Sequence, residues 1–421
     1  MIVGNPIQLL SPVSDRLAQR RAEIELLFAC ARGPAQDNVQ AAWIQEWAGQ
    51  VKDWGYVRQL ARRHQVVPLL FCGLSAADVG QVPPDMLADL RDEARDHAQH
   101  NLLLTGQMLQ ILRLLDAHGI KAIPYKGPVL AARAYHDLAL RQIGDLDLLL
   151  KPDEVARARD LLIAEGYQPW ETNEPHLNGY KHHFNLVHAP TETYVELHWA
   201  VAQAHFSFPL DTRPLWDRLE TVEVAGQRVQ SLATEDWLLI LCAHGAKHMW
   251  SHLKWLADVS ALLRSSPQID WDRVLTQAAA LQSERMLGLG LWLAHSLLAA
   301  PLPPDVLRRV LLDPALRPLA TLIYERLFDE HDDVLAVTAE RWQQLYFQFR
   351  LQRRPEARLH YLRHFLLYWG TNVNDRDRAF WHLPGRLAFL YVVLRPLRLA
   401  GRYGLGSLRQ LLASVGRTRV G

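Results

Sequence analysis

The chain has 421 residues, 49% of them apolar, and its 46 Lys and Arg balance 45 Asp and Glu. A chain of this length exceeds one compact core, so we expect several packed units. The balanced charge excludes a generally basic nucleic-acid coat. The three cysteines are far apart and form no CxxC pair, which argues against a disulfide framework or a cysteine zinc site and fits a reducing cytoplasm: Cys30, Cys72 and Cys242.

The N-terminal region is predicted to be helical. Its first residues lack a basic start and a long apolar stretch, so we expect no signal peptide. Apolar residues at three- and four-residue spacing predict helices over residues 13–116. The last of these is long, beginning at Pro83 and Pro84 and ending at Gly119.

A different pattern follows Gly119. Residues 121–125 (KAIPY) read as a short strand, a KGP turn leads into the helix GPVLAARAYHD, and residues 145–151 (DLDLLLK) form a strand that Pro152 ends. A further helix ends at Gly166, and the segments HHFNLVHA and TYVELHWA flank the turn PTE as a hairpin. Strands and helices that alternate in this way predict a small α/β unit.

Helical sequence resumes at Thr234. Residues 234–264 are predicted to form one long helix with Thr234 at its start. The most apolar run, residues 286–300, contains His295 and Ser296 and is shorter than the roughly 20 residues that a membrane span needs. It therefore predicts a buried helix, and we expect no transmembrane span.

Two carboxylates alternate with leucines in the strand at residues 145–151. Because side chains alternate faces along a strand, Asp145 and Asp147 are expected on one face. Glu196 and His198 likewise share a face of the strand YVELHW. If the two strands pair, three carboxylates converge, and their repulsion would raise one pKa sharply unless a cation compensates it. Hard oxygen ligands suit Mg²⁺ or Mn²⁺, so Asp145, Asp147 and Glu196 are candidate metal ligands.

A simpler interpretation of these carboxylates also stands. Backbone N–H groups, or an arginine such as Arg141, can satisfy acids at the end of a strand. A DxD pair alone is weak evidence. Here the pair follows a strand, a KG turn and a helix, and a third carboxylate stands on a hairpin about fifty residues further on. This order makes the metal site the more specific interpretation.

The order YKGPVLAARAYHD, RQIGDLDLLL, YVELHW resembles the nucleotidyltransferase superfamily of the polymerase-β type, and more closely its bacterial group of uncharacterised nucleotidyltransferases. The likeness covers about residues 100–265 and is weaker in the N-terminal segment LARRHQVVPLLFCGL. The resemblance implies a turn glycine that grips triphosphate, matched by Gly127. It also implies a metal-binding pair and a third carboxylate, matched by Asp145, Asp147 and Glu196. Mg²⁺ or Mn²⁺ and a nucleoside triphosphate, expected to be ATP, come with it.

The turn departs from the superfamily pattern. Pro128 follows Gly127 where the superfamily has a serine, so that hydroxyl contact to phosphate is absent. Lys126 can replace it as a point charge, and the helix beginning at Pro128 would direct its N-terminus at the phosphates. An ordinary exposed turn lysine is the alternative for Lys126. The third carboxylate is Glu rather than Asp, which preserves metal reach and leaves its geometry as a general base open.

Polar residues recur at three-, four- and seven-residue spacing along residues 234–264: His244, Lys247, His248, Ser251, Lys254, Trp255 and Asp258. A solvated helix face is the simple explanation. In the resembled group a helical domain closes over the nucleotide, which makes several of these residues, with Arg141, candidates for nucleotide binding: His244, Lys247, His248, Lys254 and Asp258. The two histidines lack the Glu of H-E-x-x-H, which argues against zinc there. His198 is a candidate for phosphate contact or proton transfer; a packed histidine is its alternative.

The C-terminal region from Arg376 onwards carries nine arginines and a single acid, Asp377. A terminal helix with a basic outer face is the simplest interpretation. A membrane-surface helix and a seat for an acidic partner, peptide or nucleic acid are the alternatives. Proline and glycine residues break any long helix there, which weakens the membrane interpretation.

Together these patterns predict a mostly helical α+β fold with a small nucleotidyltransferase-type mixed sheet between N-terminal and C-terminal helical regions. The predicted segments are an N-terminal helical region at 1–100, the nucleotidyltransferase core at 101–230, a helical domain flanking the active site at 231–310, and a C-terminal helical region with the basic tail at 311–421.

The expected function is metal-dependent transfer of a nucleotidyl group from a nucleoside triphosphate to an acceptor, with release of pyrophosphate. The resemblance implies a peptide or small-molecule acceptor rather than nucleic acid, because members of the group occur beside genes for peptide natural-product maturation. A nucleotide- or peptide-binding module with weak catalysis is one alternative, which the missing turn serine favours. A phosphotransferase that uses the same metals is the other.

Overall fold

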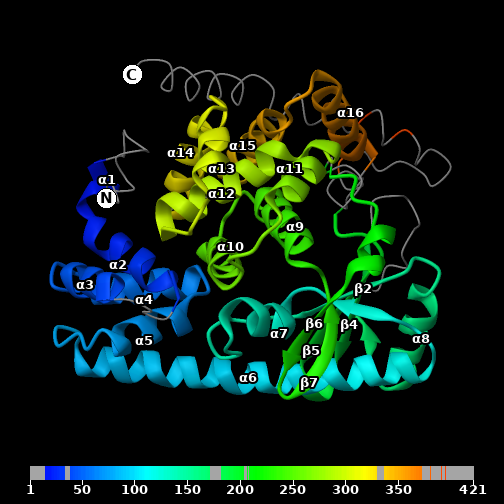
Figure 1. Cartoon of the computed structure of the whole chain (residues 1–421), viewed down its shortest axis with the longest axis horizontal. Helices are drawn as coiled ribbons and strands as arrows, with labels where there is room; N and C mark the ends of the chain where they lie inside the picture. Colours follow the sequence, from blue (N-terminus) through cyan, green and yellow to red (C-terminus); the bar gives the residue numbers. More distant parts are fainter. Residues whose placement is uncertain are drawn as a thin grey trace. The chain divides into compact units, whose positions relative to one another are not determined.

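The structure is a computed structural model of the chain, shown in Figure 1. It describes residues 15–33, 38–170, 182–202, 206, 208–329, 336–371, 380, 390 and 394. The chain divides into one unit of residues 1–204 and 208–328 and a second of residues 205–207 and 329–421. The described residues are mostly helical and contain a mixed five-stranded sheet, which confirms the predicted α+β class.

Short helices form the N-terminal part of the first unit: α1 (Asp15–Gln19), α2 (Arg21–Ala31), α3 (Asn38–Ala48), α4 (Trp54–Arg63) and α5 (Val67–Ala76). The predicted long helix follows as α6 (Pro84–Ala117). Proline at its first position and Gly119 with φ +68° just beyond its end set its limits, as predicted. Figure 1 shows α6 running beneath α5 and on past the sheet, and it packs against both α5 and the first strand. It therefore joins the N-terminal helices to the core.

The central sheet has the strand order β1-β2-β5-β4-β3. Its members are β1 (Ala122–Pro124), β2 (Leu146–Leu150), β3 (Gln168–Pro169), β4 (His183–His188) and β5 (Thr193–His198). β2 and β5 are parallel, whereas the other neighbouring pairs are antiparallel. The predicted hairpin is β4–β5, and β2 is buried along its whole length. β6 (Glu220–Val224) and β7 (Gln227–Ser231) form a separate ribbon.

The helices of the α/β unit lie where the sequence predicts them. α7 (Gly127–Leu130) follows the KG turn and continues into a π-helical turn, η2 (Ala131–Tyr135). α8 (Val155–Ala164) connects β2 to β3. η2 packs against the helical region that follows the sheet, which anchors the chain shortly before β2.

The single helix predicted for residues 234–264 is wrong. Two helices occupy this stretch, α9 (Thr234–Lys247) and α10 (Leu253–Ser265). Met249 and Trp250 between them both have φ of 50°, a backbone conformation that no helix continues through. Trp250 is fully buried, and its ring fills the space where a Cβ on Gly245 or Gly290 would stand, 2.4 Å and 3.0 Å away. Burying this large ring gives the physical reason for the break.

The remaining helices of the first unit are α11 (Trp271–Ala280), α12 (Glu284–Leu298), α13 (Pro304–Leu311) and α14 (Leu316–Leu327). α12 contains most of the apolar run at 286–300 and is buried on nearly every side, as predicted. Of the helices in the described ranges, none combines the length and apolarity needed to cross a membrane.

The second unit contains α15 (Ala336–Leu351) and α16 (Pro355–Thr371). The basic tail predicted from Arg376 onwards lies outside the described residues, apart from Phe380, Leu390 and Leu394. The division of the chain into four segments stays a prediction. Residues 1–204 and 208–328, which include parts of all four predicted segments, form one compact unit.

Candidate active site

Two carboxylates meet on the parallel strands β2 and β5. Asp147 is the register partner of Glu196, and Leu149 is the partner of His198. Paired residues of adjacent strands project to the same face of a sheet, so the strand pairing supposed from the sequence is observed. Asp147 is buried at 3% exposure, whereas the Glu196 side chain keeps 27% exposure and borders the solvent.

Asp147 contacts a lysine and a histidine. Its Oδ1 lies 3.1 Å from Lys126 Nζ and 3.0 Å from His198 Nε2. Burial acts to raise the pKa of Asp147, but Lys126 and the His198 hydrogen bond outweigh it and hold that pKa well below its usual value. Asp147 is therefore charged near neutral pH.

His198 joins the two carboxylates through a single nitrogen. Its Nε2 lies 2.9 Å from Glu196 Oε2 as well as 3.0 Å from Asp147 Oδ1. Burial acts to lower the pKa of His198, and the bonds to Asp147 and Glu196 raise it above the usual value. The Tyr125 ring, at 5.5 Å and nearly perpendicular, packs against the imidazole and fixes its plane. His198 thus holds a proton between two acids.

Asp145 has the opposite electrostatic character. It directly precedes β2 and makes none of the contacts described for Asp147. Its pKa is raised to about 6, chiefly by the charge of Asp147 and then by burial, against the attraction of Lys126. This is the repulsion that the DxD spacing predicts, and a bound cation would relieve it.

The KG turn is locked against the strand that carries the acids. Gly127 has φ +59°, and a Cβ there would stand 3.2 Å from the carbonyl oxygen of Asp145. Trp237 of α9 donates from Nε1 to the Tyr125 carbonyl at 2.6 Å, just before Lys126. A residue with a side chain would be strained at position 127, and the turn has little room to move.

Lysines from α9 and α10 face the same region. Burial lowers the pKa of Lys247 to about 8, with the charge of Lys126 as the next cause. Burial, followed by the charge of Arg141, lowers the pKa of Lys254 to about 8, and its Nζ donates to Gln65. Burial and nearby positive charge thus lower both pKa values, an effect that an anionic ligand would oppose.

Three rings on α9 and α10 pack together. His244 lies 4.8 Å from His248 and 5.3 Å from Trp255, between ring centroids. Burial and then Lys126 lower the pKa of His244 well below its usual value, and burial and then Lys247 lower that of His248 to about 4. Both imidazoles are therefore neutral at pH 7 and offer hydrogen bonds rather than charge.

Arg141 and Asp258 are brought to each other rather than to Asp147. The guanidinium donates to Asp258 at 2.9 and 3.0 Å, and the Tyr135 hydroxyl donates to the same carboxylate at 2.9 Å. Asn101 of α6, fully buried, donates to the carbonyls of Leu138 and Arg141 at 2.6 and 2.8 Å. These bonds fix the backbone that leads into Asp145.

A comparison with protein families identifies the family of the chain. Residues 50–299, more than half of the chain, match the model of a family described as uncharacterised nucleotidyltransferase. The chain belongs to this family. The resemblance proposed from the sequence is confirmed, and this nucleotidyltransferase is a transferase. No curated protein and no solved structure matches it.

The matched range in this nucleotidyltransferase contains all the site residues predicted from the sequence. It begins well before the core, so the weaker likeness in the N-terminal helices is part of the family pattern. The roles of the predicted site residues stay proposals.

Sequence reasoning missed two histidines of this site. His182 and His183 lie beside His198, with ring centroids 5.5 and 4.8 Å from it. The predicted hairpin could have indicated them, because the register of its two strands, counted from the turn, pairs His183 with His198. Burial and then Lys247 lower the pKa of His182 to about 2; burial and then His198 lower that of His183 to about 4.

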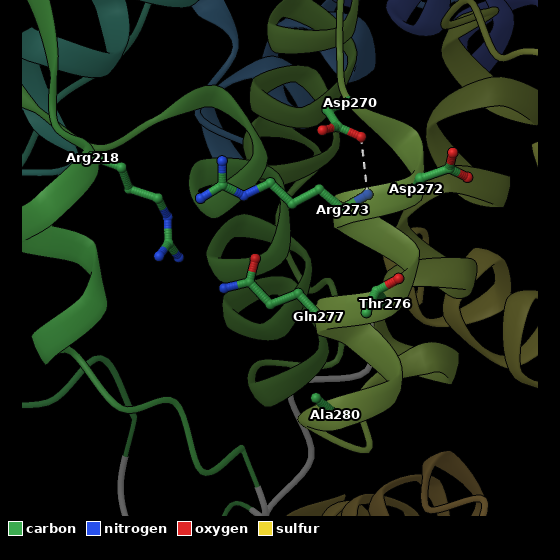
Figure 2. A pocket seen from close by; sticks show the side chains of 7 residues that line it. All are labelled: Arg218, Asp270, Asp272, Arg273, Thr276, Gln277 and Ala280. Carbon is green, nitrogen blue, oxygen red and sulfur yellow. Dashed lines mark hydrogen bonds between the residues drawn. The ribbon is translucent and has the colours of Figure 1, made fainter.

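A cavity of about 470 Å³ lies elsewhere, along α11 (Figure 2). Its lining residues are Arg218, Asp270, Asp272, Arg273, Thr276, Gln277 and Ala280. Arg218 and Gln277 reach it while bonded to Asp236 at 2.6 and 3.2 Å, and Asp270 caps α11 by accepting from the Arg273 N–H. None of the acids or lysines around Asp147 lines it, so we assign it no part in the chemistry.

Proposed function

We propose that this nucleotidyltransferase moves a nucleoside monophosphate group from a triphosphate, expected to be ATP, to a peptide or small-molecule acceptor and releases pyrophosphate. The observation that carries the proposal is the register pair Asp147–Glu196 with Lys126 bound to Asp147. Membership of the family supports nucleotidyl transfer in general. The acceptor class rests on the resemblance alone.

The donor set fits a hard divalent cation. Asp147 and Glu196 supply carboxylate oxygens, and one ligand atom from each of them and from His198 lies within 4.8 Å of the others. Asp145 is outside this group but close enough for the charge of Asp147 to raise its pKa. Asp145, Asp147 and Glu196 would hold Mg²⁺ or Mn²⁺. When bound, such an ion neutralises phosphate charge and supports the attacking and leaving oxygens of a phosphoryl displacement.

The lysines are proposed to hold the triphosphate. Lys126 sits at the turn beside Asp147, and the lowered pKa values of Lys247 and Lys254 mark amines whose positive form a phosphate would stabilise. Binding of an anion there raises those pKa values and so favours the charged amines. His244 and His248, both neutral, are proposed as hydrogen-bonding neighbours of the nucleotide.

Glu196 and His198 are proposed to manage the acceptor proton. Glu196 keeps some exposure at the edge of the site, so its carboxylate can accept a proton from an incoming hydroxyl. His198 would stabilise Asp147 and Glu196 through its Nε2, which contacts both carboxylates. Direct contact of Arg141 and Asp258 with nucleotide stays a prediction, and their mutual ion pair supports a positioning role for both.

Product analysis tests the proposal. The full-length chain is incubated with each nucleoside triphosphate, Mg²⁺ or Mn²⁺, and an extract of peptides and small molecules, and the products are identified by mass. Pyrophosphate together with an acceptor that gains a nucleotide supports nucleotidyl transfer. A nucleoside diphosphate with a phosphorylated acceptor supports the phosphotransferase instead, and nucleotide binding without any product supports the binding module.

A further inference from the structure

Three imidazoles converge beside the acids of β2 and β5. His183 is the register partner of His198 on the antiparallel strands β4 and β5, and His182 directly precedes β4. The His182 and His183 ring centroids are 4.4 Å apart. One ring nitrogen from each of the three residues lies within 4.8 Å of the others. We call this group the histidine cluster.

The spacing of the donor atoms suits a shared cation. His183 Nδ1 lies 3.4 Å from His182 Nε2. Zinc–nitrogen bonds of about 2.0–2.1 Å in a tetrahedral shell place two ligand nitrogens about 3.3–3.4 Å apart. Glu196 Oε2 lies 2.9 Å from His198 Nε2 and 4.0 Å from His183 Nε2. Glu196 therefore borders the histidine cluster.

Two of these rings carry buried nitrogens without hydrogen bonds. His182 and His198 are 4% and 2% exposed. Within the described part of the chain, Nδ1 of each ring has no hydrogen-bond partner. Leaving a polar atom buried and unpaired is unfavourable, and a bound ion is one of its ordinary explanations. His198 Nδ1 is therefore open to bind an ion while its Nε2 bonds the two acids.

We propose that His182, His183 and His198, with Glu196 beside them, form a site for a borderline divalent transition-metal ion of the Zn²⁺ and Co²⁺ type. Imidazole nitrogen suits these ions, whereas Mg²⁺ prefers oxygen ligands. This site would therefore select different ions from the carboxylate site proposed to hold the catalytic cations. Glu196 borders both sites, and His198 bonds Asp147 and Glu196 of the carboxylate site, so an ion in the histidine cluster would lie next to the proposed chemistry.

Binding of Co²⁺ alone to the full-length chain tests the site, measured by calorimetry and by the visible absorption of the ion in excess Mg²⁺. We expect one retained Co²⁺ with nitrogen-ligand absorption, displaced by Zn²⁺. His183→Gln should weaken Co²⁺ binding more than 100-fold, since removal of an outer-shell partner already costs roughly 10–100-fold. The matched control is His188→Gln, at the other end of β4, where Nδ1 bonds Thr191 at 2.7 Å. It should bind Co²⁺ like the wild type.

The proposal is overturned if the wild type retains no Co²⁺ or Zn²⁺ in excess Mg²⁺, or if His183→Gln binds like His188→Gln. His183 is only partly buried, at 22% exposure, so this variant decides the matter even if His182→Gln fails to fold. Circular dichroism checks each fold. The test uses no nucleotide, so its failure leaves nucleotidyl transfer untouched. Conversely, Asp145→Asn, outside both clusters of donor atoms, should bind Co²⁺ normally even if transfer is absent.

Discussion

Asp258 accepts two hydrogen bonds, of 2.9 and 3.0 Å, from Arg141, which stands four residues before Asp145. The pair links α10 to the segment that enters β2, although the residues are far apart in the sequence. Both side chains are buried, Arg141 at 7% and Asp258 at 1% exposure, and the Tyr135 hydroxyl also donates to the Asp258 carboxylate. The helical region thus fixes the backbone that presents the carboxylates.

Breaking this pair should destabilise the protein. Asp258→Asn or Arg141→Leu leaves a buried charge without its partner, which costs about 3–5 kcal/mol. Urea unfolding measures the loss. The control is Arg213→Ala, whose ion pair with Asp211 is exposed and should matter little. Replacing both Arg141 and Asp258 by apolar residues should recover much of the loss, and no recovery would argue against the charge-burial explanation.

The KG turn offers a matched pair of glycines. Gly127 and Gly119 both have positive φ, of +59° and +68°, so alanine costs roughly 1–2 kcal/mol of backbone strain at either. Only at Gly127 does the new Cβ meet a neighbour, the Asp145 carbonyl oxygen at 3.2 Å. We expect Gly127→Ala to lose nucleotide binding and Gly119→Ala to keep it, by calorimetry with Mg²⁺–ATP. Equal binding by both variants would contradict the assigned role of the turn.

Asp145 should make stability fall as the pH rises. Its pKa is raised from 3.8 to about 6, so the folded chain holds this proton more tightly than the unfolded chain. The contribution is fully present below pH 3.8 and is lost as the pH rises through about 6. In metal-free buffer, Asp145→Asn should therefore gain stability relative to the wild type over that range. Urea unfolding at several pH values checks this, and added Mg²⁺ should remove the difference.

Asp147, two residues on, should behave in the opposite way. Its pKa lies well below 3.8 because Lys126 and His198 outweigh the effect of burial. The contribution to stability is present above pH 3.8 and is lost as the pH falls through the lowered pKa. Asp147→Asn should destabilise the metal-free protein at neutral pH, since Lys126 and His198 lose their partner. A stabilising effect at both positions would show that repulsion dominates the whole site.

The fold was largely predictable because its signals are local. Proline and glycine mark the limits of α6, and the alternation of apolar residues places β2 and β5 with Asp147 and Glu196 on one face. The break between α9 and α10 was not predictable, since it depends on Trp250 burying its ring against Gly290, forty residues away. Periodicity within a helix carries no information about such a contact.

The candidate site was predictable in its acids and less so in its neighbours. The DxD spacing predicts the repulsion that raises the pKa of Asp145. The ion-pair partner of Arg141 could not be predicted from its position four residues before Asp145. The tertiary fold places its guanidinium beside Asp258, which is distant in the sequence. His182 and His183 were missed because their closeness to His198 arises from strand register rather than from a sequence motif.

The most direct test of nucleotidyl transfer is the Glu196→Gln variant, measured for Mg²⁺–ATP binding by calorimetry and for pyrophosphate release in the presence of acceptor. The amide preserves size and removes the charge, so a group that acts mainly in the transition state should lose turnover and keep affinity. We predict binding within about tenfold of wild type and a loss of transfer by orders of magnitude. Glu192→Gln, in the exposed turn before β5, is the control and should be fully active. Pyrophosphate release by Glu196→Gln at the rate of the wild type would contradict a catalytic role for the Asp147–Glu196 pair.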